Sequence, residues 1–319
     1  MSLTTDQALE TLLEERDRKF LRRLLGERVR FDEPLAPYTS WKIGGPADAF
    51  ATVQNESELA EVMRFCLRRK MAWWMLGGGS NVLVGDGGVR GVVIRLAGDF
   101  ASASVRSEGD RVIVEAGGSA DMALVTAKAG SAGAEGIGSL AGIPGTVGGS
   151  LRMNAGTDRE IGDFVREVWV QSPSRPQAHP ASVRYLYRHS TLERDVVVSR
   201  VMLDFPRSNA GEVRAQMQAR LVRRKATQPI ALPNAGSCFR NPEGDKAARL
   251  IEAAGAKGWR EGGAEVSKLH ANFVNNLGGA TACDVAALLA RVRRAVRDRF
   301  GIELQLEVHL VGVFIDATC

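Results

Sequence analysis

The sequence predicts an α+β protein with more than one domain. Its 319 residues are enough for two or three domains. Residues 47–96 have the order strand, helix, strand and glycine loop followed by another strand, which is typical of a small α+β unit. Alternating apolar segments at 165–170 and 196–205 predict further strands on the far side of a glycine-rich stretch.

The first unit begins with an expected amphipathic helix. Leucines recur at roughly helical spacing through residues 5–25, among acidic and basic side chains. Residues 47–53 predict a strand that ends at the polar segment 55–57, after which a helix is expected. Residues 73–76 predict a short buried strand that leads into a glycine loop, and residues 92–96 predict another strand.

The second unit follows near residue 100. Residues 102–116 alternate about a turn at 107–110 and predict a β-hairpin. A helix is expected at 120–129, with Ser119 as its N-cap. Residues 133–156 are so rich in glycine that we expect mainly loop there, with at most a short helical turn.

Two helices and a strand are expected in the remainder of the chain. A helix is predicted at 211–224, and a last helix carries an apolar stripe between Val285 and Phe300. The arginines of that last helix are interpreted as a solvated face. The alternation of residues 304–312 predicts a strand with leucines and a valine on one face and three polar residues on the other: Gln305, Glu307 and His309.

Composition narrows the function classes. The net charge of +5 suits an anionic small ligand, and the absence of a lysine block or basic–aromatic strip makes nucleic acid the weaker interpretation. Cys66, Cys238, Cys283 and Cys319 form no C-x-x-C pair, so no zinc or other metal site is predicted and reduced thiols are expected. No apolar signal segment or membrane-spanning run is evident, so we expect a cytoplasmic protein.

Two glycine loops are the most informative segments. Residues 76–83 read LGGGSNVL, and residues 142–149 read GIPGTVGG. Glycine lets a backbone approach a ligand closely, and consecutive amide groups form an anion site. Neither loop matches the Rossmann or Walker pattern. Each loop by itself is also compatible with a structural turn, but the two together predict a ligand with a diphosphate, such as a dinucleotide cofactor, held between two lobes.

Three further segments contain candidate catalytic side chains. Arg188 lies in YRHS at 187–190 and is either a carboxylate clamp or a surface arginine at a strand end. Ser237 lies in NAGSCFRNP at 234–242, where a proton donor and a plain tight turn are both compatible with the pattern. Glu307 belongs to the polar face of its strand, and this face is either exposed to solvent or directed into an active site.

Taken in order, six motifs resemble the UDP-N-acetylenolpyruvoylglucosamine reductase (MurB) family over nearly the whole chain. They include the first glycine loop at 77–83, the second glycine loop with its continuation at 142–154, and the segments at 187–190 and 235–242. The other two are YTSWKIGGPAD at 38–48 and GGAEVSKLHANF at 262–273. The pattern is closer to the shorter, type II form of the family. Six motifs in the right order are specific, although none is decisive by itself.

The resemblance implies an α+β architecture with a two-lobe FAD-binding module of the PCMH type and a C-terminal α+β substrate domain. The implied domains are residues 1–100 joined by 301–319, residues 101–207, and residues 208–300. The implied reaction is the NADPH-dependent, FAD-mediated reduction of UDP-N-acetyl-enolpyruvoylglucosamine to UDP-N-acetylmuramate in peptidoglycan precursor synthesis. FAD is expected to be non-covalent, and the expected partner is a nucleotide sugar, without nucleic acid, membrane or obligate protein partner.

Residue roles follow from the same resemblance. Arg188 matches the position that contacts the substrate carboxylate, Glu307 an acidic position that assists there, and Ser237 the proton donor. Cys238 is the rival donor, because a thiol is more acidic than a hydroxyl, but it is one residue out of place. The cofactor loops are matched by Gly77, Gly78, Gly79, Ser80, Asn81, Ile143, Gly145, Thr146 and Gly149. The substrate positions are matched by Tyr187, Arg240, Asn241 and His270.

Two other functions compete with this interpretation. The first is a flavoprotein oxidase or dehydrogenase of the vanillyl-alcohol oxidase type, in which flavin is often attached through His or Cys. None of the four histidines of this chain lies in a glycine loop. The second is a basic protein that binds nucleotide or nucleic acid without catalysis, for which the positive charge and the arginines at 291–299 are the support.

Overall fold

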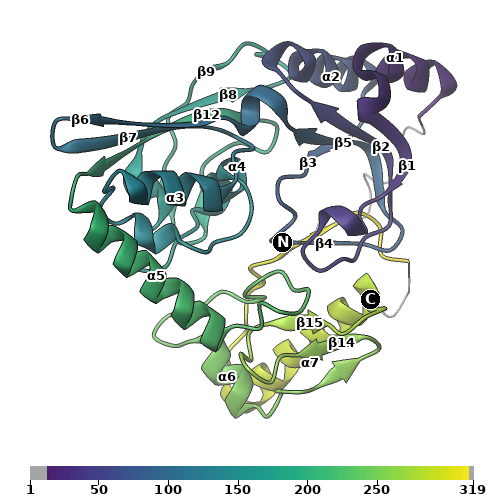
Figure 1. Ribbon diagram of the computed structural model, residues 1–319. Helices are drawn as coiled ribbons and strands as arrows, with labels where there is room; N and C mark the ends of the chain where they lie inside the picture. The colour runs from purple at the N-terminus through teal and green to yellow at the C-terminus, as the bar shows by residue number, and fades with distance from the viewer. Residues whose placement is uncertain (1–12, 316–319) are drawn as a thin grey trace.

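The computed structural model describes residues 13–315, and its first lobe is a mixed four-stranded sheet covered by two helices. The strand order is β1-β2-β5-β3, with β1 and β2 antiparallel and the other pairs parallel. Helices α1 and α2 lie together above this sheet (Figure 1). The elements are α1 (Glu15–Leu25), β1 (Val29–Pro34), β2 (Pro46–Val53), α2 (Glu56–Arg69), β3 (Trp73–Met75), β4 (Val82–Val84) and β5 (Val89–Leu96).

The second lobe is an antiparallel five-stranded sheet with order β6-β7-β12-β8-β9. Valines of its central strands pack against α3 and α4 in a core of their own. Its elements are β6 (Ala103–Glu108), β7 (Arg111–Gly117), α3 (Met122–Ser131), α4 (Val147–Met153), β8 (Val165–Gln171), β9 (His179–Pro180), the hairpin β10 (Tyr185–Leu186) and β11 (His189–Ser190), and β12 (Val197–Pro206).

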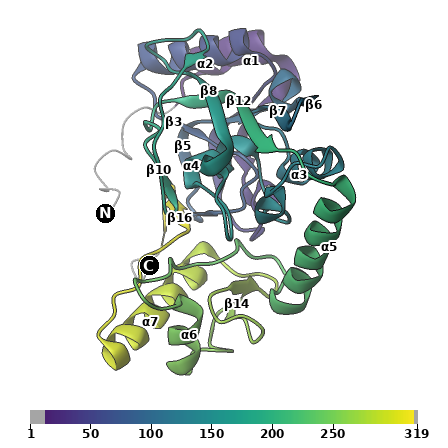
Figure 2. The same ribbon diagram turned by 90° about the vertical axis from the view of Figure 1, so that its left-hand side faces the viewer.

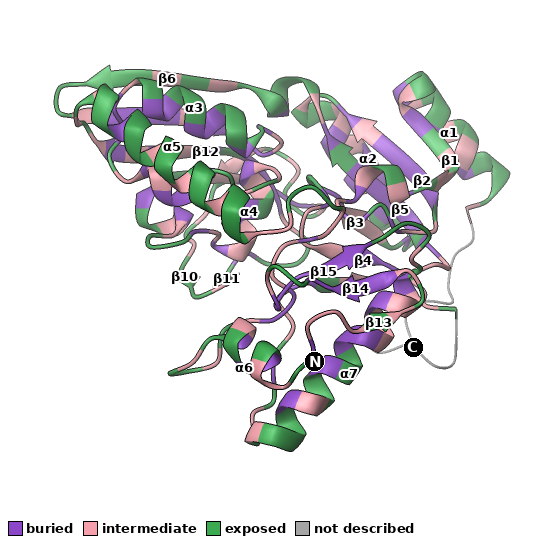
Figure 3. Ribbon diagram, turned by 60° about the horizontal axis from the view of Figure 1, so that its bottom comes forward, coloured by how far each residue is buried: buried purple, intermediate pink, exposed green. Residues whose placement is uncertain are grey.

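Helix α5 (Ala210–Thr227) connects the second lobe to the third (Figure 2). Its Val213 is buried in the core of the second lobe, while most of its surface is exposed (Figure 3). The third lobe packs two helices against a small antiparallel sheet. Its elements are α6 (Ala247–Ala253), β13 (Arg260–Glu261), β14 (Ala264–Val266), β15 (Val274–Asn276) and α7 (Ala282–Phe300).

The chain then returns to the first lobe. Strand β16 (His309–Val311) pairs in parallel with β4, so that the C-terminal segment lies beside the strand that follows the first glycine loop. The buried side chains of the third lobe include residues from the first: Trp41, Ile43 and Leu83 belong to the same cluster as the apolar stripe of α7. The first and third lobes therefore share a core.

Most expected elements are present, and the differences have local causes. The helix over 5–25 is confirmed from Glu15 onward, and its beginning lies outside the described residues. The N-cap of α3 is Asp121, whose carboxylate accepts from the amides of Ala123 and Leu124, so the assignment to Ser119 was wrong. Asp is as good an N-cap as Ser, because its carboxylate accepts from the first free amides of the helix in the same way.

Three further expectations need correction. The glycine-rich stretch contains more helix than expected, because α4 starts within the second glycine loop with Thr146 as its N-cap. Strand β3 is half-buried rather than buried. The strand over 304–312 is regular only at β16, since its earlier half still pairs with the third lobe through Leu306 and Phe239. The third difference follows from pairing with a distant segment.

The thiols divide into two kinds. Cys66 and Cys238 are free and buried, as expected. Cys283 is disulfide-bonded, so the expectation of reduced thiols was wrong for this residue. Sequence spacing does not reveal which sulfur atoms the fold brings together.

Candidate active site

The two glycine loops touch one another, although they come from different lobes. The loop at 77–81 connects β3 to β4, and the loop at 142–149 leads into α4. A Cβ atom on Gly78 would lie 2.6 Å from the Cα of Gly145, and one on Gly77 would lie 2.8 Å from Thr146 Oγ1. Ser80 Oγ donates a hydrogen bond of 3.1 Å to the carbonyl of Pro144. Only glycine permits this contact between the loops.

The backbone of the first loop offers free amide groups to an anion. Among the residues that the structure describes, none accepts a hydrogen bond from the five consecutive amides of residues 77–81. Gly77 and Gly78 are exposed, Gly79 is buried, and Ser80 and Asn81 are half-buried, so the run of amides without a partner begins at the surface and continues inward. Successive amides of this kind can form a concave site for phosphate. The loops therefore fit the diphosphate of a dinucleotide such as FAD, and a side chain at Gly77 or Gly78 would fill the space between them.

Arg188 lies at the tip of the hairpin formed by β10 and β11. Its backbone has a φ of +53°, and its guanidinium lies 4.9 Å from the ring of Tyr187. Nε donates to Glu307 Oε1 at 2.9 Å, Nη1 to Glu160 Oε1 at 3.1 Å, and Nη2 to the carbonyl of Gly156 at 3.1 Å. The side chain is 19% exposed, so the surface interpretation of this arginine does not hold.

Glu307 is held between the first and third lobes. Its amide donates to the carbonyl of Cys238, and its own carbonyl accepts from the Asn81 side chain at 3.1 Å. Burial raises the pKa of the Glu307 carboxyl, and the guanidinium of Arg188 opposes that shift. The polar face of this segment is therefore directed into a site at Glu307, where the side chain is 16% exposed.

Ser237 directly precedes Cys238, whose carbonyl accepts the hydrogen bond from the Glu307 amide. Phe239 forms a bridge with Leu306, which places the segment of Ser237 beside that of Glu307. The Ser237 side chain is half-buried, whereas Cys238 is 1% exposed within the core of the third lobe. Burial raises the pKa of the Cys238 thiol to about 12, and its enclosure in the core, rather than its acidity, separates it from the half-buried Ser237 as a candidate donor.

Comparison with known proteins agrees with this arrangement. A family model described as the C-terminal domain of UDP-N-acetylenolpyruvoylglucosamine reductase matches residues 228–311, and an FAD binding domain model matches residues 47–171. A relative of that reductase name from Anaeromyxobacter sp. (strain Fw109-5) is 45% identical over 92% of this chain and 91% of its own. The chain belongs to the UDP-N-acetylenolpyruvoylglucosamine reductase family. A relative of the same name from Moorella thermoacetica is 43% identical over 89% of this chain and 94% of its own.

The solved structures contain the same fold. The crystal structure of the reductase (MurB) from Thermus caldophilus superposes with a TM-score of 0.76 at 33% identity, and the match covers 89% of this chain and 98% of that one. The expected α+β architecture, with an FAD-binding module and a MurB C-terminal domain, is thereby confirmed.

The four residues expected at the substrate have different surroundings. Tyr187 is exposed beside Arg188. Arg240 lies close enough to Glu307 to oppose the rise of its pKa, and Arg240 Nε is buried without a hydrogen-bond partner among the described residues. Asn241 Oδ1 accepts from the amide of Ala247 at the start of α6. His270 packs edge-on against Phe273, and burial lowers the pKa of its imidazole.

Sequence reasoning missed Glu160 and Asn154. Glu160 contacts Arg188, and the Asn154 amide donates both to Glu160 and to the carbonyl of Leu186 in the Arg188 hairpin. Asn154 is buried at the end of α4 with a φ of +45°. Asn154 is the last residue of the motif at 142–154, and Glu160 follows six residues later, but nothing in the sequence links either residue to Arg188.

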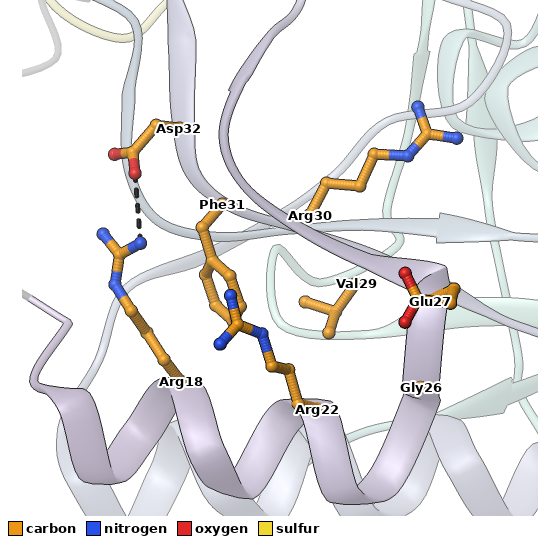
Figure 4. A pocket seen from close by; sticks show the side chains of 8 residues that line it. All are labelled: Arg18, Arg22, Gly26, Glu27, Val29, Arg30, Phe31 and Asp32. Carbon is orange, nitrogen blue, oxygen red and sulfur yellow. Dashed lines mark hydrogen bonds and ion pairs between the residues drawn. The ribbon is translucent and has the colours of Figure 1, made fainter.

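An open cavity lies away from this MurB site. It has a volume of about 410 Å³ and lies between α1 and β1, where Arg18 and Arg22 flank Phe31 (Figure 4). Arg18 is paired with Asp32 at 3.0 Å, so the positive charge beside this cavity is already partly neutralised.

Within residues 13–315, no cluster of metal-ligating side chains is found, and no helix is long and apolar enough to cross a membrane.

Proposed function

We propose that Arg188, Glu307 and Ser237 form the catalytic group of this reductase. As a member of its family, the chain reduces UDP-N-acetyl-enolpyruvoylglucosamine to UDP-N-acetylmuramate with FAD and NADPH, a step of peptidoglycan precursor synthesis. The observation that carries the proposal is the contact of three lobes at one point. Arg188 reaches Glu307 at 2.9 Å, and Glu307 pairs through its amide with the residue that follows Ser237.

The cofactor residues are proposed from the loop geometry. The amides of Gly77, Gly78, Gly79, Ser80 and Asn81 hold the diphosphate of FAD, and the second loop contacts the flavin through Ile143, Gly145, Thr146 and Gly149. FAD supplies the hydride, received from NADPH, that is added to the substrate. We propose that the cofactor is not covalently attached, since residues 76–83 and 142–149 contain neither His nor Cys.

Arg188 acts on the carboxylate of the substrate. Three of its N–H groups are used within the protein, which leaves one N–H on each terminal nitrogen of the guanidinium. These donors bind the carboxylate that is conjugated to the enol ether. Addition of hydride to the terminal carbon moves an electron pair toward that carboxylate, and the fixed guanidinium stabilises the developing enolate. Glu307 assists in its protonated form, which its burial favours.

Ser237 completes the reaction by transferring the proton of its Oγ to the other carbon of the double bond. Serine is a weak acid, so its contribution rests on position, and its proton is replaced from solvent. Tyr187, Arg240, Asn241 and His270 are proposed to contact the nucleotide sugar. Arg240 has the strongest support, because its buried Nε has no partner among the described residues.

The experiment that tests the proposed function is a pair of half-reactions with the FAD-loaded enzyme. Wild-type protein should oxidise NADPH continuously only when the enolpyruvyl sugar is present. Ser237→Ala should still accept electrons from NADPH but lose turnover of the sugar by about 10²- to 10⁴-fold, as expected for removal of an acid–base group. Stopped-flow absorbance and steady-state assays measure the two steps.

Cys238→Ala is the control for Ser237→Ala, since the thiol is enclosed in the core. It should retain both half-reactions. Equal loss of both half-reactions in Ser237→Ala, or full turnover without the hydroxyl, would remove Ser237 from the mechanism.

The domain boundaries, the cytoplasmic location and the partners are also proposals. The pairing of β16 with β4 supports the assignment of residues 301–319 to the domain formed by residues 1–100, and the separate core of the second lobe supports the unit at 101–207. The remaining unit is residues 208–300. The small positive charge is compatible with an anionic nucleotide-sugar partner, and we propose that no nucleic acid, membrane or obligate protein partner is needed.

A further inference from the structure

Arg188 is bound by two carboxylates, and only one of them belongs to the proposed catalytic group. Glu307 Oε1 lies 2.9 Å from Nε, and Glu160 Oε1 lies 3.1 Å from Nη1. Both acidic side chains are largely enclosed, with exposed fractions of 16% and 23%. A single guanidinium therefore holds two acids in a place where water screens their charges poorly.

Glu160 is itself fixed in place by its neighbours. Its amide donates to Asp163 Oδ2 at 3.0 Å, and its carboxylate accepts from the amide of Asn154. Asn154 also binds the Arg188 hairpin through the carbonyl of Leu186. Glu160 therefore couples the end of α4 to the guanidinium, and its position is set before any substrate arrives.

Burial favours the neutral form of both acids, and the charges around them modify that preference. Glu307 is influenced by Arg188, Arg240 and Glu160, and Glu160 by Arg188 and Asp163. Burial raises the pKa of both carboxyls, and the negative charge of Glu160 raises the pKa of Glu307 further. A substrate carboxylate on Arg188 adds a third negative group to the same cation. That addition favours protonation of the pair.

We propose that Glu160 is a positioning residue of the reductase, which shares Arg188 with Glu307, so that binding of the substrate carboxylate to Arg188 brings a proton onto this pair of acids. The inference rests on the proposed function, because it requires a carboxylate ligand on Arg188. It explains how Glu307 becomes protonated at the moment when the enolate must be stabilised.

Proton uptake on binding tests the proposal without turnover. The oxidised, FAD-loaded enzyme is titrated with the enolpyruvyl sugar by calorimetry, without NADPH, near neutral pH in buffers with different ionisation enthalpies. Wild-type enzyme should take up a measurable fraction of a proton, and Glu160→Gln less than half of that amount. The matched control is Glu58→Gln, which removes an enclosed acid from its pair with Arg28 in the first lobe. It should take up the wild-type amount.

The pH profile separates a positioning role from a structural one. In Glu160→Gln the basic limb of kcat/KM should move to lower pH by about one unit, because the Glu307 pKa falls when a neighbouring negative charge is removed. Glu160→Asp keeps the charge but shortens the reach to Arg188, so it should retain the wild-type limb with a higher KM. This second variant tests the proposal even if the first does not fold.

Two results would overturn the inference. One is wild-type proton uptake in Glu160→Gln together with an unchanged basic limb. The other is a shifted limb in Glu160→Asp with an unchanged KM. Failure of the proposed function itself would give a different result. The wild-type enzyme would then neither bind the enolpyruvyl sugar nor oxidise NADPH in its presence.

Discussion

Arg188 has a strained backbone and three fixed acceptors. A φ of +53° is uncommon for a residue with a side chain and costs of the order of 1 kcal/mol or more. The turn between β10 and β11 places the guanidinium between Glu307, Glu160 and the carbonyl of Gly156. These charge-assisted hydrogen bonds offset the strain and determine the direction of the remaining donors.

Arg188→Lys should damage the reaction although it keeps the charge. An ammonium group cannot hold Glu307 and Glu160 and still present paired donors to a carboxylate. We expect kcat/KM for the enolpyruvyl sugar to fall about a hundredfold or more, consistent with the loss of one or two hydrogen bonds to charged groups. Steady-state kinetics on the FAD-loaded enzyme measure the effect.

Arg28→Lys is the control for that substitution. Arg28 also holds a carboxylate with two nitrogens, at 2.5 and 2.7 Å from Glu58, but it lies between the start of β1 and α2. Its variant should keep wild-type kcat/KM. Full activity in Arg188→Lys would mean that the paired donors are not used.

At the scale of elements, the two glycine loops form one structure. The first loop is presented by the short half-buried strand β3, and the second loop enters α4, whose N-cap is Thr146. Each loop blocks the space that a side chain on the other would need. Contact between the loops, rather than either loop alone, creates the cradle for the cofactor.

Gly78→Ala tests this contact by adding one methyl group. The new Cβ would lie 2.6 Å from the Cα of Gly145, so the two loops must separate. We expect FAD affinity to fall about tenfold or more, which corresponds to roughly 1.4 kcal/mol. Flavin fluorescence titration of the apoprotein measures the dissociation constant.

The control places the same methyl group in a turn far from the cofactor. Gly109 lies in the turn between β6 and β7 with a φ of +59°, where an added Cβ meets nothing within 4 Å. Gly109→Ala should lower stability slightly through backbone strain and leave FAD affinity unchanged. Equal affinity in Gly78→Ala and wild type would show that the loops yield without cost.

At the scale of the whole molecule, the first and third lobes behave as one packed body. Trp41 is fully buried among third-lobe side chains, and its indole Nε1 donates to the carbonyl of Val274 at 2.7 Å. The Asn276 side chain returns a bond of 2.9 Å to the Trp41 carbonyl. Asp86 accepts from the amide of Ala282 at 2.9 Å at the start of α7. These bonds fix the first and third lobes against each other, and both lobes contact Glu307 of the candidate active site.

Trp41→Phe should weaken both lobes together. It removes the donor for the buried Val274 carbonyl, a loss of about 1–3 kcal/mol in the free energy of unfolding. We expect one cooperative transition at lower urea concentration in the FAD-loaded protein, followed by far-UV circular dichroism. Trp259→Phe, at a half-buried ring packed against Arg291, is the control and should change the midpoint less. Separate transitions for the two lobes would contradict a shared core.

The sequence by itself determined the family, the order of most elements, the two glycine loops and the identity of the main candidate side chains. These features depend on local requirements, such as glycine where backbones approach and apolar residues at a regular period. Sequence reasoning also identified Glu307, but it left open whether the polar face of its strand is exposed to solvent or forms part of an active site.

Only the tertiary structure decided which side chains meet. Arg188 and Glu307 are 119 residues apart in the sequence, and nothing in the spacing of either segment indicates their contact. The burial of Cys238, the late start of the expected strand at 304–312 and the role of Glu160 depend likewise on packing between lobes. The physical reason is that burial and charge pairing are properties of segments brought together by the fold, and these properties set the protonation of the acids.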